Sequence, residues 1–185
     1  MKTRTKRVLL GLLPLTGLTL AVSAPGAEGN SRATAVLTDA SGATAGRVTM
    51  TARGGKLIVE ARLSRPSTAS GFHGFHIHTV GVCNPADGFA SAGGHLGSLD
   101  GETHAGHDGE MPSLLVGADG QARLAFQTDR ATLAEILDGD GSAVIVHEGA
   151  DNYANIPVRY APAGPDATTL STGDAGPRLL CGVLQ

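Results

Sequence analysis

Short runs of alternating polar and apolar residues, separated by glycine-containing turns, constrain the fold of this chain most. Residues 47–53 place Val48, Met50 and Ala52 on one face, and Gly54-Gly55 then provides a two-residue hairpin turn. Similar runs, with a second turn at Ala118-Asp119-Gly120, occupy residues 33–39, 57–63, 71–79, 113–116, 121–128, 142–147 and 178–184. About eight short strands of this kind predict an all-β, antiparallel sandwich or barrel.

One helix is predicted, at residues 131–137 after the candidate N-cap Asp129. The stretches 80–110 and 148–177 show neither a strand period nor a helix period. Loops of about 30 residues inside a compact domain are usually functional or disordered. Both stretches follow strands that carry histidine near their ends, so we expect two long functional loops.

The first residues have the order of a secretory signal peptide. Four basic residues lie within 1–7, an apolar run fills 8–22, and small residues follow at 23–27. A membrane anchor is the alternative, but the run has 15 residues and contains Pro14, whereas a spanning helix needs about 20 apolar residues. We expect a signal peptide at 1–27, cut between residues 24 and 27, a linker at 28–32 and one domain at 33–185.

Charge and cysteine content agree with export. The net charge is −3 for the whole chain and −7 after residue 27, which argues against a nucleic-acid binder because such proteins carry a basic stripe. Cys83 and Cys181 are predicted to form a disulfide, as paired cysteines in exported proteins usually do. A pair of metal thiolates is the alternative, but metal-binding cysteines are spaced more closely or have further cysteines nearby.

Six of the seven histidines indicate a metal centre. In residues 71–78, alternation puts Phe75 and Ile77 on the core face and His76 and His78 on the other. Two imidazoles so placed can reach one metal ion, and imidazole suits copper and zinc. Alone, the pair could equally be surface histidines. Four more lie in the first long loop or at a strand end, at positions 95, 104, 107 and 147.

Four segments together carry a family resemblance: Gly71-Phe-His-Gly-Phe-His-Ile-His78, Gly94-His95, Val146-His147-Glu-Gly-Ala-Asp151 and Gly176-Pro-Arg178-Leu-Leu-Cys181-Gly-Val183. They resemble the signature segments of the copper/zinc superoxide dismutases, and the resemblance runs from about Arg32 to Gln185. It implies an eight-stranded Greek-key barrel or immunoglobulin-like sandwich. It also implies an exported antioxidant enzyme that converts superoxide to oxygen and hydrogen peroxide by redox cycling of a histidine-bound copper.

The resemblance also implies a role for each candidate residue. Copper would be held by His76, His78, His95 and His147, and zinc by His95, His104, His107 and Glu110. The catalytic residues would be Arg178, which holds the superoxide anion, and His95, which bridges the metals and carries a proton. Asp151 would orient one ligand of each metal, Cys83 and Cys181 would form the family's disulfide, and His73 would tie loops to a strand.

Three departures from the family pattern shape the expectations. His104 and His107 are only three residues apart, Glu110 stands where the family has Asp, and no lysine follows Lys56. We therefore expect weak zinc binding with His104 the least firmly placed, and an attracting field from Arg178 and the metal, helped by Arg159.

The alternative function is a non-catalytic, exported copper-binding or buffering protein, which would need the histidines but not Arg178. The sequence leaves open a monomer or a homodimer, and a location in the periplasm, the cell envelope or the cell exterior.

Overall fold

The computed structural model describes residues 31–65, 68–98 and 103–185, so the expected signal peptide at 1–27 and most of the linker lie outside the described residues. The described part contains nine strands: β1 (Arg32–Thr38), β2 (Thr44–Arg53), β3 (Lys56–Ser64), β4 (Gly71–His73), β5 (Phe75–His78), β6 (Leu114–Val116), β7 (Gln121–Thr128), β8 (Ala143–His147) and β9 (Arg178–Val183). The helices are α1 (Leu133–Ile136) and α2 (Ala167–Thr172), with single 3-10 turns at Pro85–Asp87 and Ala90–Ala92.

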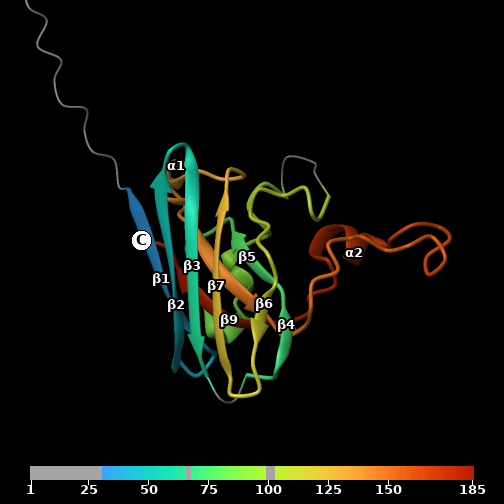
Figure 1. Ribbon diagram of the computed structural model, residues 1–185, viewed down its shortest axis with the longest axis horizontal. Helices are drawn as coiled ribbons and strands as arrows, with labels where there is room; N and C mark the ends of the chain where they lie inside the picture. The colour runs from blue at the N-terminus through green and yellow to red at the C-terminus, as the bar shows by residue number, and fades with distance from the viewer. Residues whose placement is uncertain (1–30, 66–67, 99–102) are drawn as a thin grey trace, which may run out of the picture.

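Seven strands form one curled antiparallel sheet in the order β5-β8-β9-β1-β2-β3-β7 (Figure 1). β4 and β6 pair in a separate two-stranded sheet. The predicted all-β antiparallel class is thereby confirmed, and the hairpin at Gly54-Gly55 joins β2 to β3 as expected. The segment after β8 projects away from the sheet on the side of α2 (Figure 1).

The expected single strand at 71–79 is divided into β4 and β5 at Gly74. Here the backbone leaves one sheet for the other: the Gly74 N–H donates to the Gly149 carbonyl, and its own carbonyl accepts from the His147 N–H. A Cβ at this position would lie 2.6 Å from the Cβ of Ala175. The break therefore results from close packing against the second long loop.

Both helices differ from the sequence expectation. The first begins after Thr132, not Asp129, because Thr132 and Glu135 form a capping box in which each side chain accepts from the other's backbone N–H. The second, α2, lies inside a stretch expected to be loop. It follows the N-cap Asp166 and ends at Gly173, whose φ is 58°. The buried residue of α2 is Thr169, so no apolar period marks it.

The core lies between the inward faces of the sheet and contains fully buried side chains such as Met50, Val59, Phe75, Ile77 and Val146. β8 is buried on both faces. Its Val144 and Val146 join this core, whereas Ala143 and Ile145 pack with Phe89, Ala92 and Cys181 in a second, smaller cluster under the first long loop. No helix among the described residues is long and apolar enough to cross a membrane.

Candidate metal centre

The expected metal ligands lie together around the ends of β5 and β8. His76 and His78 project from β5, and His147 ends β8. All three are buried, with exposed fractions of 4% or less. The first long loop closes over β5, because isolated β-bridges pair His78 with His95 and His76 with Glu110. Two points of this loop, 15 residues apart, are thereby held against the same strand.

The first set of ligands consists of His76, His78, His95 and His147, whose candidate ligand atoms lie within 4.8 Å of one another. Three of these rings are oriented by their other nitrogen. His78 Nδ1 donates to the Gly93 carbonyl at 2.9 Å, His147 Nδ1 to the Gly176 carbonyl at 2.8 Å, and His76 Nε2 bonds Asp151 Oδ2 at 2.7 Å.

The remaining nitrogens of these three rings, His76 Nδ1, His78 Nε2 and His147 Nε2, are buried without a hydrogen-bond partner among the described residues. A buried unpaired nitrogen is unfavourable unless something binds it. Four imidazoles suit copper, which tolerates nitrogen ligands in both of its common oxidation states. The first set therefore fits a copper ion.

Burial also favours the neutral form of three of these histidines. Desolvation lowers the pKa of His78 and of His95, and together with the nearby His76 ring it lowers the pKa of His147 to about 3. A histidine must be neutral to bind a metal. At neutral pH His78 and His147 need lose no proton before binding, whereas His95, which belongs to both ligand sets, must lose its one N–H proton to bind through both nitrogens.

The second set of ligands consists of His95, His104, His107 and Glu110. The Nδ1 atoms of the three histidines lie 2.8, 3.0 and 2.9 Å from Glu110 Oε1. Three imidazole nitrogens and one carboxylate oxygen are a suitable tetrahedral set for zinc. His104 is thus as close as the other two, in contrast to the expectation from the short spacing. Ala105, with a φ of 73°, turns the chain between His104 and His107.

Asp151 connects the two sets. Its Oδ2 accepts from His76 Nε2, and its Oδ1 accepts from His104 Nε2, both at 2.7 Å. Burial alone would lower the pKa of His104, but the hydrogen bond to Asp151 and the nearby Glu110 carboxylate raise it to about 9. Burial raises the pKa of the Glu110 and Asp151 carboxyl groups, but their contacts with His104 and the other histidines outweigh it, so the pKa of both groups is lowered. The second set therefore places His104 between two carboxylates that favour its protonated form.

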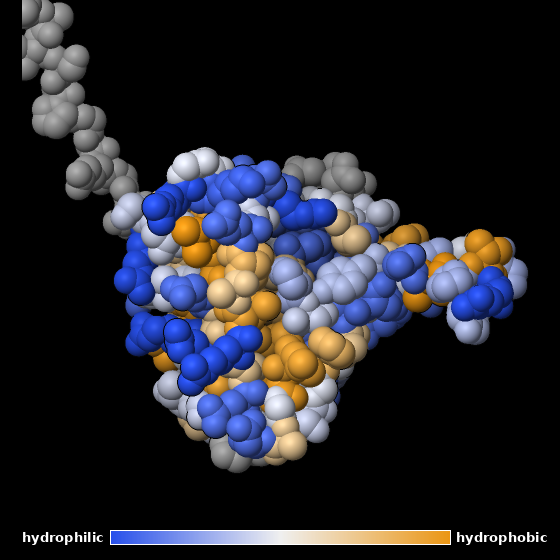
Figure 2. Space-filling model, in the orientation of Figure 1, coloured by the Kyte–Doolittle hydropathy of each residue, from blue (hydrophilic) through white to orange (hydrophobic). Residues whose placement is uncertain are grey.

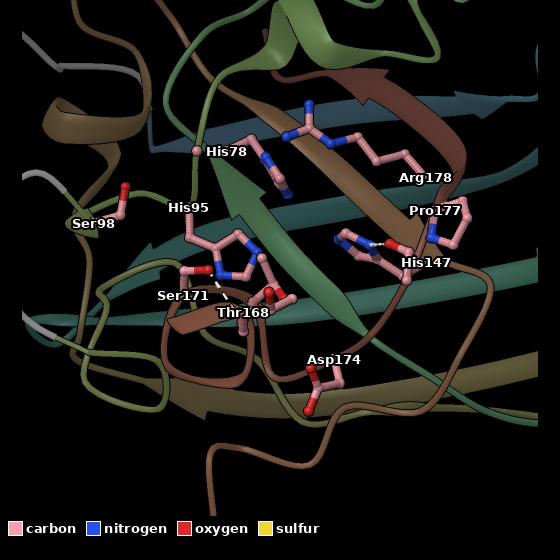
Figure 3. Close-up of a pocket in the computed structure, with 12 residues that line it drawn as sticks. His78, His95, Ser98, His147, Thr168, Ser171, Asp174, Pro177 and Arg178 are labelled. Atoms are coloured by element: carbon pink, nitrogen blue, oxygen red, sulfur yellow. Dashed lines mark hydrogen bonds between the residues drawn. The ribbon is translucent and has the colours of Figure 1, made fainter. Parts of the chain in front are cut away.

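Arg178 enters the site from β9, where it pairs with His147 of β8. Its Nη1 donates to the Phe89 carbonyl, and its Nη2 donates to the Gly93 carbonyl at 2.6 Å. The guanidinium borders a cavity of about 750 Å³ that His78, His95 and His147 also line (Figure 3). Arg159 does not line this cavity; its guanidinium lies 4.9 Å above the Tyr160 ring.

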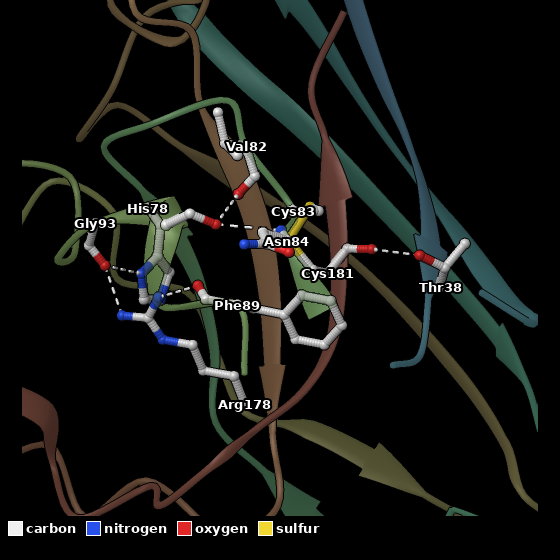
Figure 4. The surroundings of a disulfide bond; sticks show 10 residues. Thr38, His78, Val82, Cys83, Asn84, Phe89, Gly93, Arg178 and Cys181 are labelled. Atoms are coloured by element: carbon white, nitrogen blue, oxygen red, sulfur yellow. Dashed lines mark hydrogen bonds between the residues drawn. A yellow bond between two sulfur atoms is a disulfide. The ribbon is translucent and has the colours of Figure 1, made fainter. Parts of the chain in front are cut away.

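The disulfide between Cys83 and Cys181 is confirmed (Figure 4). It joins β9 to the start of the loop that supplies the Phe89 and Gly93 carbonyls. His73 belongs to neither ligand set: Nδ1 bonds the His147 carbonyl at 2.8 Å and Nε2 bonds the Ala69 carbonyl at 2.9 Å. It ties a loop to the strand ends, the role that the resemblance implies.

Sequence reasoning missed two groups of residues at the site. Tyr153 stacks on His104, with ring centroids 6.3 Å apart, and its hydroxyl bonds both the backbone N–H and the hydroxyl of Ser113. The cavity also has a polar lining made of Ser98, Thr168, Ser171, Thr172 and Asp174 (Figure 3). The only sequence signal is position, because these residues sit inside the two long loops.

The comparisons with known proteins agree with this arrangement. Residues 44–184 match the sequence model of the copper/zinc superoxide dismutase family. A "Superoxide dismutase [Cu-Zn]" of Mycobacterium tuberculosis is 48% identical over 128 residues, which are 62% of this chain and 53% of that protein. The match thus spans about half the length of the mycobacterial relative.

Two further matches extend over more of the chain. A "Superoxide dismutase [Cu-Zn]" of Deinococcus radiodurans is 31% identical over 193 residues, covering 95% of this chain and 96% of the relative. The crystal structure of a SOD-like protein from Bacillus subtilis superposes with a TM-score of 0.64 at 30% identity, covering 82% of this chain and 97% of that one. The chain belongs to the copper/zinc superoxide dismutase family.

Proposed function

We propose that this protein is a superoxide dismutase that turns two superoxide anions and two protons into oxygen and hydrogen peroxide. The observation that carries the proposal is that Arg178 shares one cavity with three histidines of the copper-fitting set. When bound by His76, His78, His95 and His147, copper supplies the one-electron redox chemistry, and zinc at the second set supplies fixed positive charge.

Arg178 binds the substrate anion. A guanidinium carries five N–H donors, and the Phe89 and Gly93 carbonyls take up only part of them. Because these two backbone acceptors fix the side chain, the remaining donors are oriented before the anion arrives. Arginine is always charged, so this docking does not depend on pH in the physiological range.

His95 is suited to hold a proton for the product. Its Nδ1 is occupied by Glu110 at 2.8 Å, which leaves Nε2 as the nitrogen on the side of the first ligand set. Desolvation lowers its pKa, so a proton held on Nε2 is readily given up to a basic peroxide oxygen.

Attraction of the anion depends on few charges. The chain is acidic, with a net charge of −3, and Arg178 is the one lysine or arginine among the described residues that line the cavity. Asp174 lines the same cavity, and the hydroxyl groups of α2 add polarity without charge. We infer that the local field of Arg178, with that of the bound metals, overcomes the unfavourable average charge.

We also propose that the protein is exported, with residues 33–185 forming the working domain after a signal peptide at 1–27. The disulfide supports this, because such bonds persist in oxidising compartments. The competing function, copper storage without catalysis, would use the histidines alone and gives no reason to fix Arg178 beside them with two carbonyl groups.

The test compares variants of the oxidised, full chain loaded with copper and zinc. A charge-assisted hydrogen bond is worth about 1.5–3 kcal/mol, so Arg178→Ala should lower the rate at low superoxide by roughly 10–100-fold without changing copper content. Arg178→Lys should lose less, and Arg159→Ala, with the same charge change outside the cavity, should lose little. Protein loaded with zinc alone should be inactive.

Two outcomes would contradict the proposal. If the copper-loaded protein showed only the rate of free copper, the storage function would be favoured. If copper content fell in step with activity in Arg178→Ala, the arginine would support the ligands and would not dock the anion.

A further inference from the structure

Three arginines form a row across neighbouring strands of the seven-stranded sheet. In the sheet register, Arg47 of β2 lies opposite Arg62 of β3, and Arg62 lies opposite Arg123 of β7. All three are exposed, whereas Val48, Ala61, Leu63 and Ala122 beside them in the chain are buried. We call this row the arginine ladder. It holds three of the ten lysines and arginines that follow residue 31.

No carboxylate in the described part of the chain pairs directly with the arginine ladder. Among the described residues, no carboxylate oxygen lies within 4 Å of any of its three guanidinium groups, whereas Arg65 pairs with Asp39. The nearest acidic residue along the strand is Glu60, two residues before Arg62 on the same face of β3. Like charges directly opposite each other across strands destabilise a sheet. The arginine ladder therefore works against stability.

Protection of a sheet edge explains only part of the arginine ladder. Charged side chains on edge strands prevent pairing with other chains, and β7 is an edge of the seven-stranded sheet. This accounts for Arg123. β2 and β3 are interior strands, so Arg47 and Arg62 have no such role.

The surface beside the arginine ladder is hollowed, and its lining mixes polar side chains with apolar ones such as Val36 and Leu63. A depression of about 330 Å³ is lined by all three arginines together with Thr44, Ser64 and Gln121. A second depression of about 240 Å³ is lined by Arg62, Arg123 and Glu60. The face that carries β2, β3 and β7 toward the viewer in Figure 1 shows a strongly hydrophilic band in Figure 2. Neither depression shares a lining residue with the metal cavity.

We propose that the arginine ladder binds linear inorganic polyphosphate, a polyanion that carries a phosphate group at every unit along its length. Adjacent strands are about 4.8 Å apart, so the three guanidinium groups are spread over about 10 Å in one line across the strands. A single phosphate would meet only one or two of them, whereas a chain of phosphates can meet all three. Guanidinium groups match phosphate oxygens with paired hydrogen bonds. The rest of this acidic chain repels such a polymer, so binding is confined to the ladder.

The experiment measures binding of long-chain inorganic polyphosphate to the oxidised full chain at several salt concentrations. Arg62→Gln removes the central charge, and Arg53→Gln removes an equal, exposed charge at the β2–β3 hairpin. Arg62→Gln should weaken binding by about tenfold and reduce the slope of log K against log salt by about 1, as loss of one phosphate contact does. Arg53→Gln should change affinity by less than about twofold. The melting temperature of Arg62→Gln should be unchanged or higher, because repulsion is relieved.

Four results would overturn the proposal: equal losses in both variants, salt-independent binding, orthophosphate binding as tightly as the polymer, or an Arg62-dependent dimer in mass measurements. Binding to vesicles of anionic phospholipid without binding to polyphosphate would also overturn it and would assign this face to a membrane surface.

Discussion

Reducing the disulfide between Cys83 and Cys181 should destabilise the metal-free protein by about 4–5 kcal/mol. The bond closes a loop with a sequence separation of 98, and the chain-entropy model gives about 4.7 kcal/mol for a loop of about 100 residues at 25 °C. The effect lies mainly in the unfolded chain, which gains freedom when the bond is broken. Cys181 is fully buried beside Phe89 and Ile145, so its thiol can stay packed in the folded state.

Urea unfolding with and without a reductant measures this loss. A slope of about 2 kcal/mol per M urea is typical of small proteins, so the midpoint should fall by about 2 M. The double variant Cys83→Ala/Cys181→Ala should show the lower midpoint without reductant and should not respond to it. A loss below about 1 kcal/mol with an unchanged slope would refute the reasoning, because it would mean that the loop closure does not constrain the unfolded chain.

The same reduction should affect catalysis before it affects metal content. The loop that starts at Cys83 supplies the Phe89 and Gly93 carbonyls that fix Arg178, and Cys181 lies three residues after that arginine. Reduced protein that is still folded should therefore lose rate at low superoxide while it keeps its copper. Unchanged activity in the folded, reduced protein would show that the carbonyls hold Arg178 without the bond.

Three further predictions follow from single contacts. Excess zinc should raise the melting temperature of the copper-loaded protein. His104→Ala should abolish this rise as fully as His107→Ala does, because the Nδ1 atoms of the two histidines lie equally close to Glu110 Oε1. If His104→Ala kept the rise, His104 would be dispensable for zinc binding. Asp39 accepts hydrogen bonds from Ser41, which lower its pKa from 3.8 to about 2. The stabilising effect of the ionised Asp39 should be complete above pH 3.8 and lost as the pH falls through 2. The melting temperatures of wild type and Asp39→Asn should therefore converge in that range, and a constant difference between them would contradict this. Tyr153→Phe should cost about 1 kcal/mol in urea unfolding because it loses the Ser113 bonds, while the zinc-dependent rise is kept because the ring still stacks; loss of that rise would assign the hydroxyl to the zinc site.

Local patterns predict much of the fold, and long-range contacts explain where they fail. Alternation and Gly54-Gly55 predict the β2–β3 hairpin, since both are local properties of the chain. The break at Gly74 depends on Ala175, about a hundred residues away, so no local pattern announces it. Helix α2 is rich in hydroxyl residues and has no apolar period, because it covers the site and not the core.

The candidate site divides in the same way. Residue type and spacing identify the imidazoles, because few side chains other than histidine suit both metals. The carbonyls of Gly93 and Gly176 that orient two of these rings cannot be read from sequence, since every residue has a carbonyl. The turn that brings His104 and His107 to one point depends on Ala105 at positive φ, a conformation uncommon outside glycine.

The place of β9 in the sheet has a consequence for how the protein is made. β9 follows every other described strand in the chain, yet it lies between β8 and β1 in the interior of the sheet. At about 5–20 residues per second, the ribosome completes Val183 roughly 7–29 s after Thr38, the end of β1. Throughout that interval β1 has an unpaired edge, which invites aggregation, and β8 has one from the completion of His147 onward. The sheet can therefore close only after β9 has been made, and until then the site lacks Arg178, although every candidate metal ligand is already in the chain.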